Sequence, residues 1–273
     1  MTTISTRHAL ITGGACGIGK LVARRMAAMG AEVTLWDLDA AALDATVAEL
    51  QASGGRAHGH VCDVSDREAV ADVAARVLEE AGPVDILMNN AGVVSGAYLL
   101  DLSDEQIERT FKVNVMSMYW TTRAFLPAMI ERRCGHIVTV ASAAGLIGTR
   151  KETDYAASKF AAVGFNESLR MELRLLAPGV KTTVFCPYYI DTGMFAGVRT
   201  RFPLLLPILK QDKAADRIVR AVQMNRAQVL MPWMVRTLPA MRLLPVPAFD
   251  ALADFFGVNA CMDDFVGRGA PDA

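Results

Sequence analysis

A chain of 273 residues is long enough for one large α/β domain, and we expect a single domain over residues 1–273. Its 28 Lys and Arg against 29 Asp and Glu give a formal net charge of -1, which offers no electrostatic reason to expect nucleic acid as a partner. Five scattered cysteines lack the paired spacing of a zinc site, so we expect no metal and reduced thiols in a cytoplasmic protein.

The first predicted strand, residues 8–12, leads directly into a glycine loop and then a helix over 20–29. Glycine permits a tight turn and a close backbone approach, and a helix N-terminus presents free N–H groups to an anion. Strand, glycine loop and helix in this order predict a pyrophosphate site of a dinucleotide cofactor. The loop residues assigned to that cofactor are Gly13, Ala15, Cys16, Gly17, Ile18 and Gly19.

The second predicted strand, residues 31–37, ends in Asp37, 18 residues after Gly19. A carboxylate at this spacing reaches the ribose hydroxyls of adenosine and repels the 2′-phosphate of NADP. The places where NADP enzymes of this type tend to carry a basic residue hold Cys16 and Leu38 instead. The cofactor predicted is therefore NAD, and the alternative for Asp37 is a plain strand-end or helix-capping acid.

Short apolar strands and helices then alternate along the chain. Helices are predicted over 39–53 and 66–81, and strands over 56–61 and 83–88. The third strand delivers Asp63, which can accept a hydrogen bond from adenine, and the fourth leads into a second glycine-containing turn. This alternation predicts a Rossmann-type doubly wound parallel sheet of about seven strands with helices on both faces. The segments that follow the third and fourth strands add five residues to the predicted cofactor residues: Asp63, Val64, Asn90, Ala91 and Gly92.

Candidate catalytic residues follow in the next three elements. A helical region over 103–133, interrupted near Pro127, carries Asn114; a strand over 135–141 ends at Ser142. The helix over 152–176 carries Tyr155 and Lys159, which stand on one face because they are four residues apart. A cation near a phenol stabilises the phenolate, so this pair suits proton transfer, although such a short pattern alone is more often structural.

Five segments in this order resemble the signature of the short-chain dehydrogenase/reductases over nearly the whole chain: residues 12–19, 89–92, 112–114, Ser142, and 155–159. The resemblance implies that Tyr155 exchanges a proton with the substrate oxygen during hydride transfer. It implies that Lys159 lowers the tyrosine pKa and holds the nicotinamide ribose, and that Ser142 hydrogen-bonds the substrate oxygen.

The resemblance also implies that Asn114 anchors a water that relays protons from Lys159. A bridge between backbone groups is the alternative for Asn114. Glu152 and Asp154, which flank the tyrosine, are interpreted as ordinary partners of the helix dipole without a catalytic role.

The loop after the sixth predicted strand, residues 180–186, begins Pro-Tyr where the family usually has Pro-Gly, so Tyr188 makes the backbone path here less certain. The resemblance implies nicotinamide contacts from Pro187, Ile190 and Thr192. The substrate pocket is assigned to Tyr188, Tyr189, Met194 and Phe195.

Residues 186–195, 201–210 and 221–233 resemble the branch that contains animal retinol dehydrogenases, retinal reductases and lipid-acting 17β-hydroxysteroid dehydrogenases. That branch implies a lipophilic alcohol or carbonyl substrate. An apolar substrate flap over about 188–215 agrees with it, because leucines and isoleucines suit a hydrophobic pocket rim. An ordinary helix packed on the core is the alternative.

After a last strand over 228–231, residues 232–273 form an apolar extension broken by prolines and carrying Arg236 and Arg242. It is expected to lack a membrane span, because no apolar run is long enough. Peripheral membrane contact, contact with another subunit and packing on its own core remain open for this extension. The family resemblance implies a homodimer or homotetramer formed through the helices around Asn114 and Tyr155.

These observations predict an NAD-dependent alcohol dehydrogenase or carbonyl reductase acting on a retinoid-like or long-chain substrate. A hydroxysteroid or aryl-ketone reductase with the same residues is the alternative among enzymes. The alternative from another class is a catalytically silent NAD-binding sensor or scaffold. We expect a cytoplasmic protein, with membrane contact through the extension left open.

Overall fold

The computed structural model describes residues 1–267; the end of the predicted extension, residues 268–273, lies outside the described residues. A parallel sheet of seven strands runs through it in the order β3-β2-β1-β4-β5-β6-β7. The predicted Rossmann-type fold is confirmed. The strands are β1 (His8–Thr12), β2 (Glu32–Asp37), β3 (Arg56–Val61), β4 (Ile86–Asn89), β5 (Gly135–Val140), β6 (Val180–Pro187) and β7 (Gln228–Met231).

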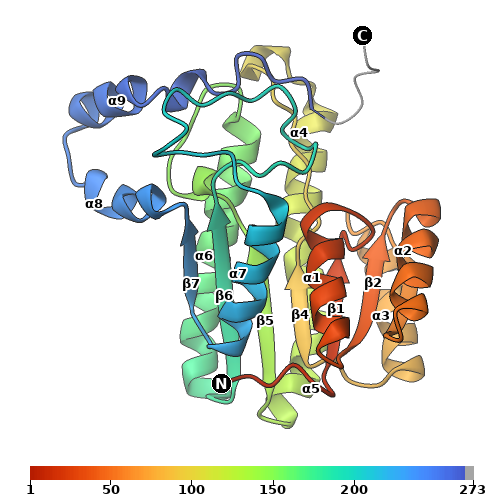
Figure 1. The fold of residues 1–273 in the computed structure, drawn as a ribbon. Coiled ribbons are helices and arrows are strands. Elements are labelled where there is room, and N and C mark those ends of the chain that lie inside the picture. The colour runs from red at the N-terminus through yellow and green to blue at the C-terminus, as the bar shows by residue number, and fades with distance from the viewer. Residues whose placement is uncertain (268–273) are drawn as a thin grey trace.

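Helices cover both faces of the sheet, and each face has its own apolar core (Figure 1). One core contains α1 (Gly17–Ala28), α2 (Ala40–Ala52) and α7 (Gln211–Gln223). The other contains α3 (Arg67–Glu80), α5 (Ser117–Glu131) and α6 (Thr153–Leu176). Because side chains of a strand alternate between faces, Ala9 and Ile11 of β1 enter the first core and Leu10 enters the second. This two-sided burial agrees with the mostly apolar sequences of the central strands β1 and β4, which are buried throughout.

The strand order reverses at β1, which has β2 on one side and β4 on the other. The connections after β1 and β4 therefore diverge, and a crevice opens beyond the carboxyl ends of these two strands. The main predicted motifs, the glycine loop and the turn that contains Asn90, follow these two strands directly. The topology thus places them at one edge of the sheet.

The helical region predicted over 103–133 differs from the expectation in where it is interrupted. It consists of α4 (Asp104–Phe111), a π-helical turn η2 (Lys112–Met116) and α5, and Pro127 lies inside α5. The interruption predicted near Pro127 is therefore wrong, since burial of Phe125 and Met129 holds α5 through the proline. The irregular turn lies at Asn114 instead, and π-helical turns are frequent at functional positions.

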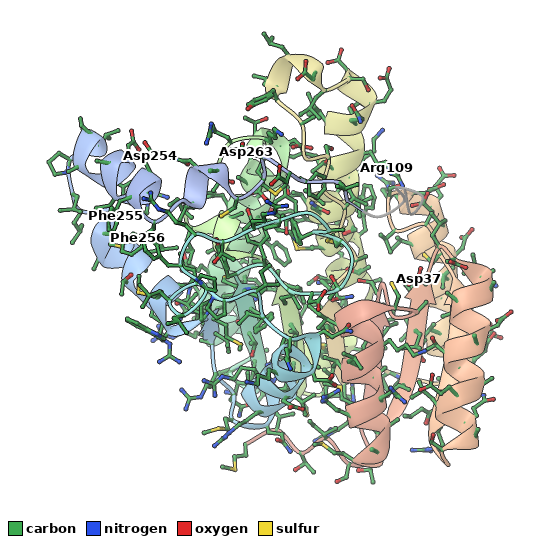
Figure 2. The ribbon with its side chains drawn as sticks, turned by 45° about the horizontal axis from the view of Figure 1, so that its top comes forward. Asp37, Arg109, Asp254, Phe255, Phe256 and Asp263 are labelled. Carbon is green, nitrogen blue, oxygen red and sulfur yellow. The ribbon has the colours of Figure 1, made fainter. Side chains whose placement is uncertain are left out.

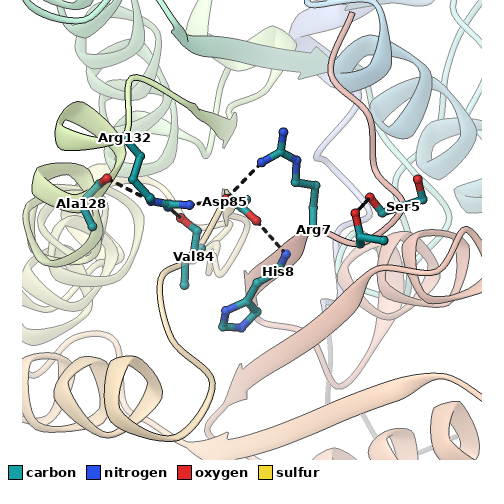
Figure 3. A network of polar contacts seen from close by, with 8 residues as sticks. Ser5, Arg7, His8, Val84, Asp85, Ala128 and Arg132 are labelled. Carbon is teal, nitrogen blue, oxygen red and sulfur yellow. Dashed lines mark hydrogen bonds and ion pairs between the residues drawn. The ribbon is translucent and has the colours of Figure 1, made fainter.

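A network of ionic contacts holds the opposite edge of the sheet (Figure 3). Asp85, just before β4, accepts hydrogen bonds from Arg132 Nη1 at 2.6 Å and from the backbone N–H of His8 at 3.1 Å. Arg7 Nη1 lies 3.5 Å from the same carboxylate. Asp85 therefore joins the starts of β1 and β4 to the end of α5 and fixes the relative position of the two strands that carry the motifs.

The C-terminal extension folds back over the carboxyl ends of the strands, beside the long segment that follows β6 (Figure 1). Arg242 Nη1 donates to the carbonyl of Leu146 at 2.7 Å, and Lys151 Nζ donates to the carbonyl of Asp263 at 3.0 Å. Of the three environments left open for the extension, packing on the rest of the same chain is therefore the one observed on its inner side. Its elements are η4 (Trp233–Thr237), α8 (Leu238–Met241), α9 (Val246–Phe255) and η5 (Val258–Ala260).

In the part of the chain that the structure describes, no helix combines the length and the apolar character needed to cross a membrane. Two short helical turns complete the fold: η1 (Leu99–Asp101) after β4, and η3 (Ala143–Gly145) after β5.

We predict that Asp85→Ala lowers the free energy of unfolding by ~2 kcal/mol, because it leaves two cations and a buried backbone N–H without their shared acceptor. Urea unfolding at neutral pH measures this. The control is Glu108→Ala, which removes an exposed pair with Lys112 and should cost about 0.5 kcal/mol or less. Equal losses in the two variants would contradict a structural role for Asp85.

Candidate active site

A cavity of about 260 Å³ lies beyond the carboxyl ends of the central strands. Most of the residues predicted from sequence line it. From the nucleotide set these are Gly13, Cys16, Gly17, Ile18, Asp37, Leu38, Asp63, Val64, Asn90, Ala91, Gly92, Pro187, Ile190 and Thr192; from the catalytic and substrate sets they are Ser142, Tyr155, Lys159, Tyr188, Met194 and Phe195. Ala15, Gly19, Asn114 and Tyr189 were also predicted, but they do not line this cavity.

The glycine loop requires its glycines for two separate reasons. Gly13 and Gly17 have φ of 63° and 55°, in the left-handed region that other residues rarely adopt. At Gly19 the reason is space, since a Cβ there would lie 2.2 Å from the carbonyl oxygen of Gly13. Asn90 Nδ2 donates to the carbonyls of Thr12 and Gly13 at 2.9 and 3.0 Å and so holds the loop against the turn after β4.

Asp37, the last residue of β2, lines this cavity, and Figure 2 labels it. One carboxylate oxygen accepts from the backbone N–H of Ala15 at 2.9 Å, and the other accepts from that of Asp39 at 3.2 Å. The N-cap of α2 is Asp39, so Asp37 is not the helix-capping acid considered as an alternative. Leu38 beside it is 58% exposed, which leaves an apolar side chain at the same rim.

Asp63 and Val64 form the wall of the cavity beyond β3. One oxygen of Asp63 accepts from the backbone N–H and the hydroxyl of Ser65, at 2.9 and 2.7 Å. These hydrogen bonds fix the orientation of the carboxylate, and Val64 is buried beside it.

Ser142, Tyr155 and Lys159 meet at the inner end of the cavity. Ser142 follows β5, and its hydroxyl accepts from the backbone N–H of Ala144 at 3.1 Å. Tyr155 and Lys159 lie one turn apart on α6, and the lysine nitrogen is 5.5 Å from the centre of the tyrosine ring. Lys159 Nζ donates to the carbonyl of Val140 at 3.0 Å, so β5 holds the lysine in place.

Burial dominates the electrostatics of this group. It raises the pKa of the Tyr155 phenol well above its ordinary value; the carboxyl of Glu152 acts in the same direction, and a hydrogen bond with Ser142 opposes them. Burial also lowers the pKa of the Lys159 ammonium to about 8. Without a bound ligand, the phenol of Tyr155 therefore stays protonated, and the ammonium group of Lys159 loses its proton more easily than an exposed lysine does.

Asn114 acts as a bridge between three segments. Its Nδ2 donates to the carbonyl of Val93 at 2.9 Å and to the hydroxyl of Ser158 at 3.0 Å, and its Oδ1 accepts from the backbone N–H of Val93 at 2.8 Å. The bridging alternative from the sequence is therefore observed. A Cβ at Gly92 would lie 3.4 Å from Asn114 Oδ1 and 3.6 Å from Lys159 Nζ, so both polar atoms face the same glycine.

The segment after β6 carries the residues predicted for nicotinamide and substrate. Ile190 forms an isolated parallel bridge with Leu209, and the backbone N–H of Leu209 donates to the carbonyl of Tyr189 at 2.8 Å. This bridge ties the predicted substrate flap to its own beginning. The apolar residues of the predicted flap have different surroundings: Leu206 lines a second cavity, Leu209 enters the core, and Leu204 is 95% exposed.

The second, smaller cavity adjoins the first at Ser142, Tyr188 and Phe195, which line both. Both tyrosine rings of the 187–195 segment are buried in its wall, with ring centres 4.6 Å apart. The opposite wall comes from the extension, and its side chains are apolar apart from one threonine. That wall consists of Met234, Val235, Thr237, Leu238, Met241, Phe249, Ala253, Phe256 and Val258. Figure 2 shows Phe255 and Phe256 on the other side of the molecule from Asp37.

Glu152 does not behave as an ordinary partner of the helix dipole. It is the N-cap residue of α6 but its side chain makes no capping hydrogen bond; it is 1% exposed and lines the second cavity. Burial raises the pKa of its carboxyl to about 7. Asp154 is also buried, and its carboxylate accepts from Ser95 and Thr110 at 2.8 Å each. The interpretation from sequence was therefore wrong about Glu152, whereas Asp154 lies in the first turn of α6 as expected.

Sequence reasoning missed several lining residues. Most of them adjoin predicted residues, so the neighbours of each motif were the available signal: Cys62, Ser65, Val93, Val113, Val140 and Ala141. Trp36 adjoins Asp37 in the same way. Arg109 had no such signal, because it reaches the cavity rim from α4 (Figure 2).

Comparisons with known proteins agree with this geometry. The family model described as short chain dehydrogenase matches residues 7–202. Epidermal retinol dehydrogenase 2 of Mus musculus is 42% identical over 262 residues, which cover 95% of this chain and 85% of the relative.

Two solved structures are similar in fold and sequence. A short-chain dehydrogenase/reductase from Burkholderia phymatum in complex with NAD has a TM-score of 0.81 at 30% identity, covering 89% of this chain and 95% of that one. A metagenomic short-chain oxidoreductase in complex with NADP has a TM-score of 0.72 at 31% identity, covering 84% and 97%. The protein belongs to the short-chain dehydrogenase/reductase family and is an oxidoreductase, as the order of its motifs predicted.

Proposed function

We propose that residues 1–273 form one catalytic unit that transfers a hydride between NAD and a lipophilic alcohol or carbonyl compound, with Tyr155 as the general acid and base. One observation carries this proposal. Ser142, Tyr155 and Lys159 lie in the nucleotide cavity, and Ser142 also lines the adjoining apolar cavity. A substrate held in the second cavity would therefore present its reacting carbon at the boundary with the first.

The residues of the first cavity suit a dinucleotide. Gly13 and Gly19 leave room for a backbone approach that a Cβ would block, and the N-terminus of α1 offers free N–H groups to a pyrophosphate. Asp37 supports NAD over NADP, because its carboxylate would repel a 2′-phosphate at the rim. Lys159 and the segment 187–192 would hold the nicotinamide end.

A bound nicotinamide supplies the hydride acceptor for alcohol oxidation and the hydride donor for carbonyl reduction. Tyr155 would take the proton of the substrate hydroxyl in the first direction and return it in the second. Because burial keeps the phenol protonated, the group is best prepared to donate a proton to a carbonyl oxygen. The Ser142 hydroxyl would hydrogen-bond the same oxygen, and the apolar walls would exclude water.

The proton that Tyr155 exchanges must come from solvent. We propose that Asn114 serves this exchange by placing a water near Lys159, supported by the position of both polar atoms beside Gly92. The walls of the second cavity, together with the retinol dehydrogenase among the relatives, support a lipophilic substrate of retinoid or long-chain type.

We predict that Tyr155→Phe lowers kcat for a long-chain or retinoid alcohol by about 100-fold to 10,000-fold, because it removes the proton donor and keeps the ring. NADH binding, measured by fluorescence titration, should stay within a few-fold of the wild type. The control is Tyr98→Phe, at an exposed position outside both cavities. Retained turnover in Tyr155→Phe would contradict the role of Tyr155, and a wild type that binds NADH but oxidises no alcohol would favour the sensor alternative.

We predict that the wild type prefers NAD to NADP by about tenfold or more in kcat/KM, and that Asp37→Ser reduces or reverses this preference. Removing the carboxylate takes away the repulsion of the 2′-phosphate and the acceptor for the ribose hydroxyls. The control is Asp39→Ser at the N-cap of α2, where serine keeps the cap. A wild-type preference for NADP would contradict the argument and point to Arg109 as the phosphate ligand.

We also propose a homodimer or homotetramer formed through the helices around Asn114 and Tyr155. Its support is the exposed apolar side chains there: Phe111, Met116, Tyr119 and Phe160. A monomer in sedimentation experiments at micromolar concentration would contradict it.

A cytoplasmic location is proposed from the five cysteines, all of which are free thiols.

We propose peripheral membrane contact through the outer side of the extension, where Leu243 is 87% exposed and Trp233, Val246 and Phe255 are exposed as well. Leu243→Ser combined with Phe255→Ser should then lower co-flotation with phosphatidylserine-containing vesicles at least about tenfold. The control is Leu175→Ser, at an equally exposed leucine near the far end of α6. Equal flotation of the two variants, or no flotation of the wild type, would contradict this proposal.

A further inference from the structure

Glu152 is a buried ionisable side chain that the proposed hydride and proton transfer does not use. It lies in the wall of the second cavity, whose other lining side chains are mostly apolar. Oε2 accepts a hydrogen bond from the hydroxyl of Thr149, and Oε1 accepts one from the hydroxyl of Tyr189 at 3.5 Å. The second contact is at the outer limit of a hydrogen bond.

The hydrogen-bonding capacity of this carboxylate is only partly used. An ionised carboxylate can accept about four hydrogen bonds, and these two hydroxyls supply one close and one long contact. None of the described Lys or Arg side chains counters its charge, and the nearest charged influence is Asp154, which is also acidic. A buried carboxylate without a cation is costly unless further donors reach it. The carboxyl of Glu152 therefore has acceptor capacity that these two hydroxyls leave unused.

Contacts between aromatic rings connect Glu152 to Tyr155 across the two cavities. The ring of Tyr155 contacts that of Phe195, with centres 5.8 Å apart, and Phe195 contacts Tyr189 at 5.0 Å. The hydroxyl of Tyr189 then reaches Glu152. Glu152 thus lines only the second cavity, whereas Tyr155 lines only the first.

We propose that Glu152 is a specificity-determining residue that accepts a hydrogen bond from a hydroxyl group on the substrate, remote from the carbon that exchanges hydride. The substrate class is then a lipophilic alcohol or ketone with a second hydroxyl group. This inference rests on the proposed function of the same site. A purely structural Glu152, serving only to hold Thr149 and Tyr189, is the competing explanation.

The test compares 1-alkanols with α,ω-alkanediols of matched chain length in kcat/KM, over a series of lengths. The wild type should prefer the diol by about tenfold or more at its best length, beyond the statistical advantage of two reactive ends. Glu152→Leu should reduce that ratio to the statistical advantage, and Glu152→Gln, which keeps an acceptor, should retain part of it. Thr237→Val, a change of the one threonine in the opposite wall, should leave the ratio unchanged.

Two outcomes would overturn the inference: a wild type without a preference for diols at any length, or equal losses on both substrates in Glu152→Leu. Failure of the proposed function gives a different result, namely no turnover of any alcohol. Equilibrium binding of diol and alkanol to the NADH complex of Tyr155→Phe then decides about Glu152 on its own. Tighter binding of the diol that Glu152→Leu abolishes supports the inference, and equal binding overturns it.

Discussion

The contact between the glycine loop and the turn after β4 is the constraint on which the site depends. Asn90 donates to the carbonyls of Thr12 and Gly13, and the hydroxyl of Thr12 accepts from the backbone N–H of Asn90 at 3.0 Å. These bonds join β1 and β4 where the strand order reverses. The cavity beyond them is open because neighbouring connections diverge, and these hydrogen bonds hold its two central loops together.

Burial controls the protonation of the ionisable side chains in the site. Tyr155, Lys159 and Glu152 are each at most 4% exposed. The same desolvation that raises the pKa of the phenol and the carboxyl lowers that of the ammonium, so all three groups shift towards their neutral forms. A neutral phenol suits proton donation to a carbonyl. In the proposed function, oxidation of an alcohol needs the phenolate, which a nearby cation stabilises, so the charge of Lys159 would influence the pH at which oxidation becomes fast.

Most residues that line the first cavity were predictable from the sequence, and most of those that line the second were not. The left-handed backbone at Gly13 and the close approach at Gly19 favour glycine alone, so the motif can be recognised in the amino-acid sequence. Any apolar side chain of suitable size could take the place of Met234 or Phe256. The composition therefore shows that the segment is apolar but not which part of the fold it packs against. Glu152 was misinterpreted for the same reason, because acids in the first turn of a helix are common and only tertiary packing buries this one.

This asymmetry has a consequence for how such a protein diverges. Substitutions in the extension change the wall of the second cavity without touching Ser142, Tyr155 or Lys159, since η4 and α9 reach that cavity from beyond the last strand. A polar residue in the wall has a larger effect than an apolar exchange. An added methylene changes binding by about 1–3 kcal/mol, whereas an unmatched buried polar group rejects a substrate far more strongly. In the role proposed for it, the carboxyl of Glu152 would carry more information about the substrate than the apolar residues around it.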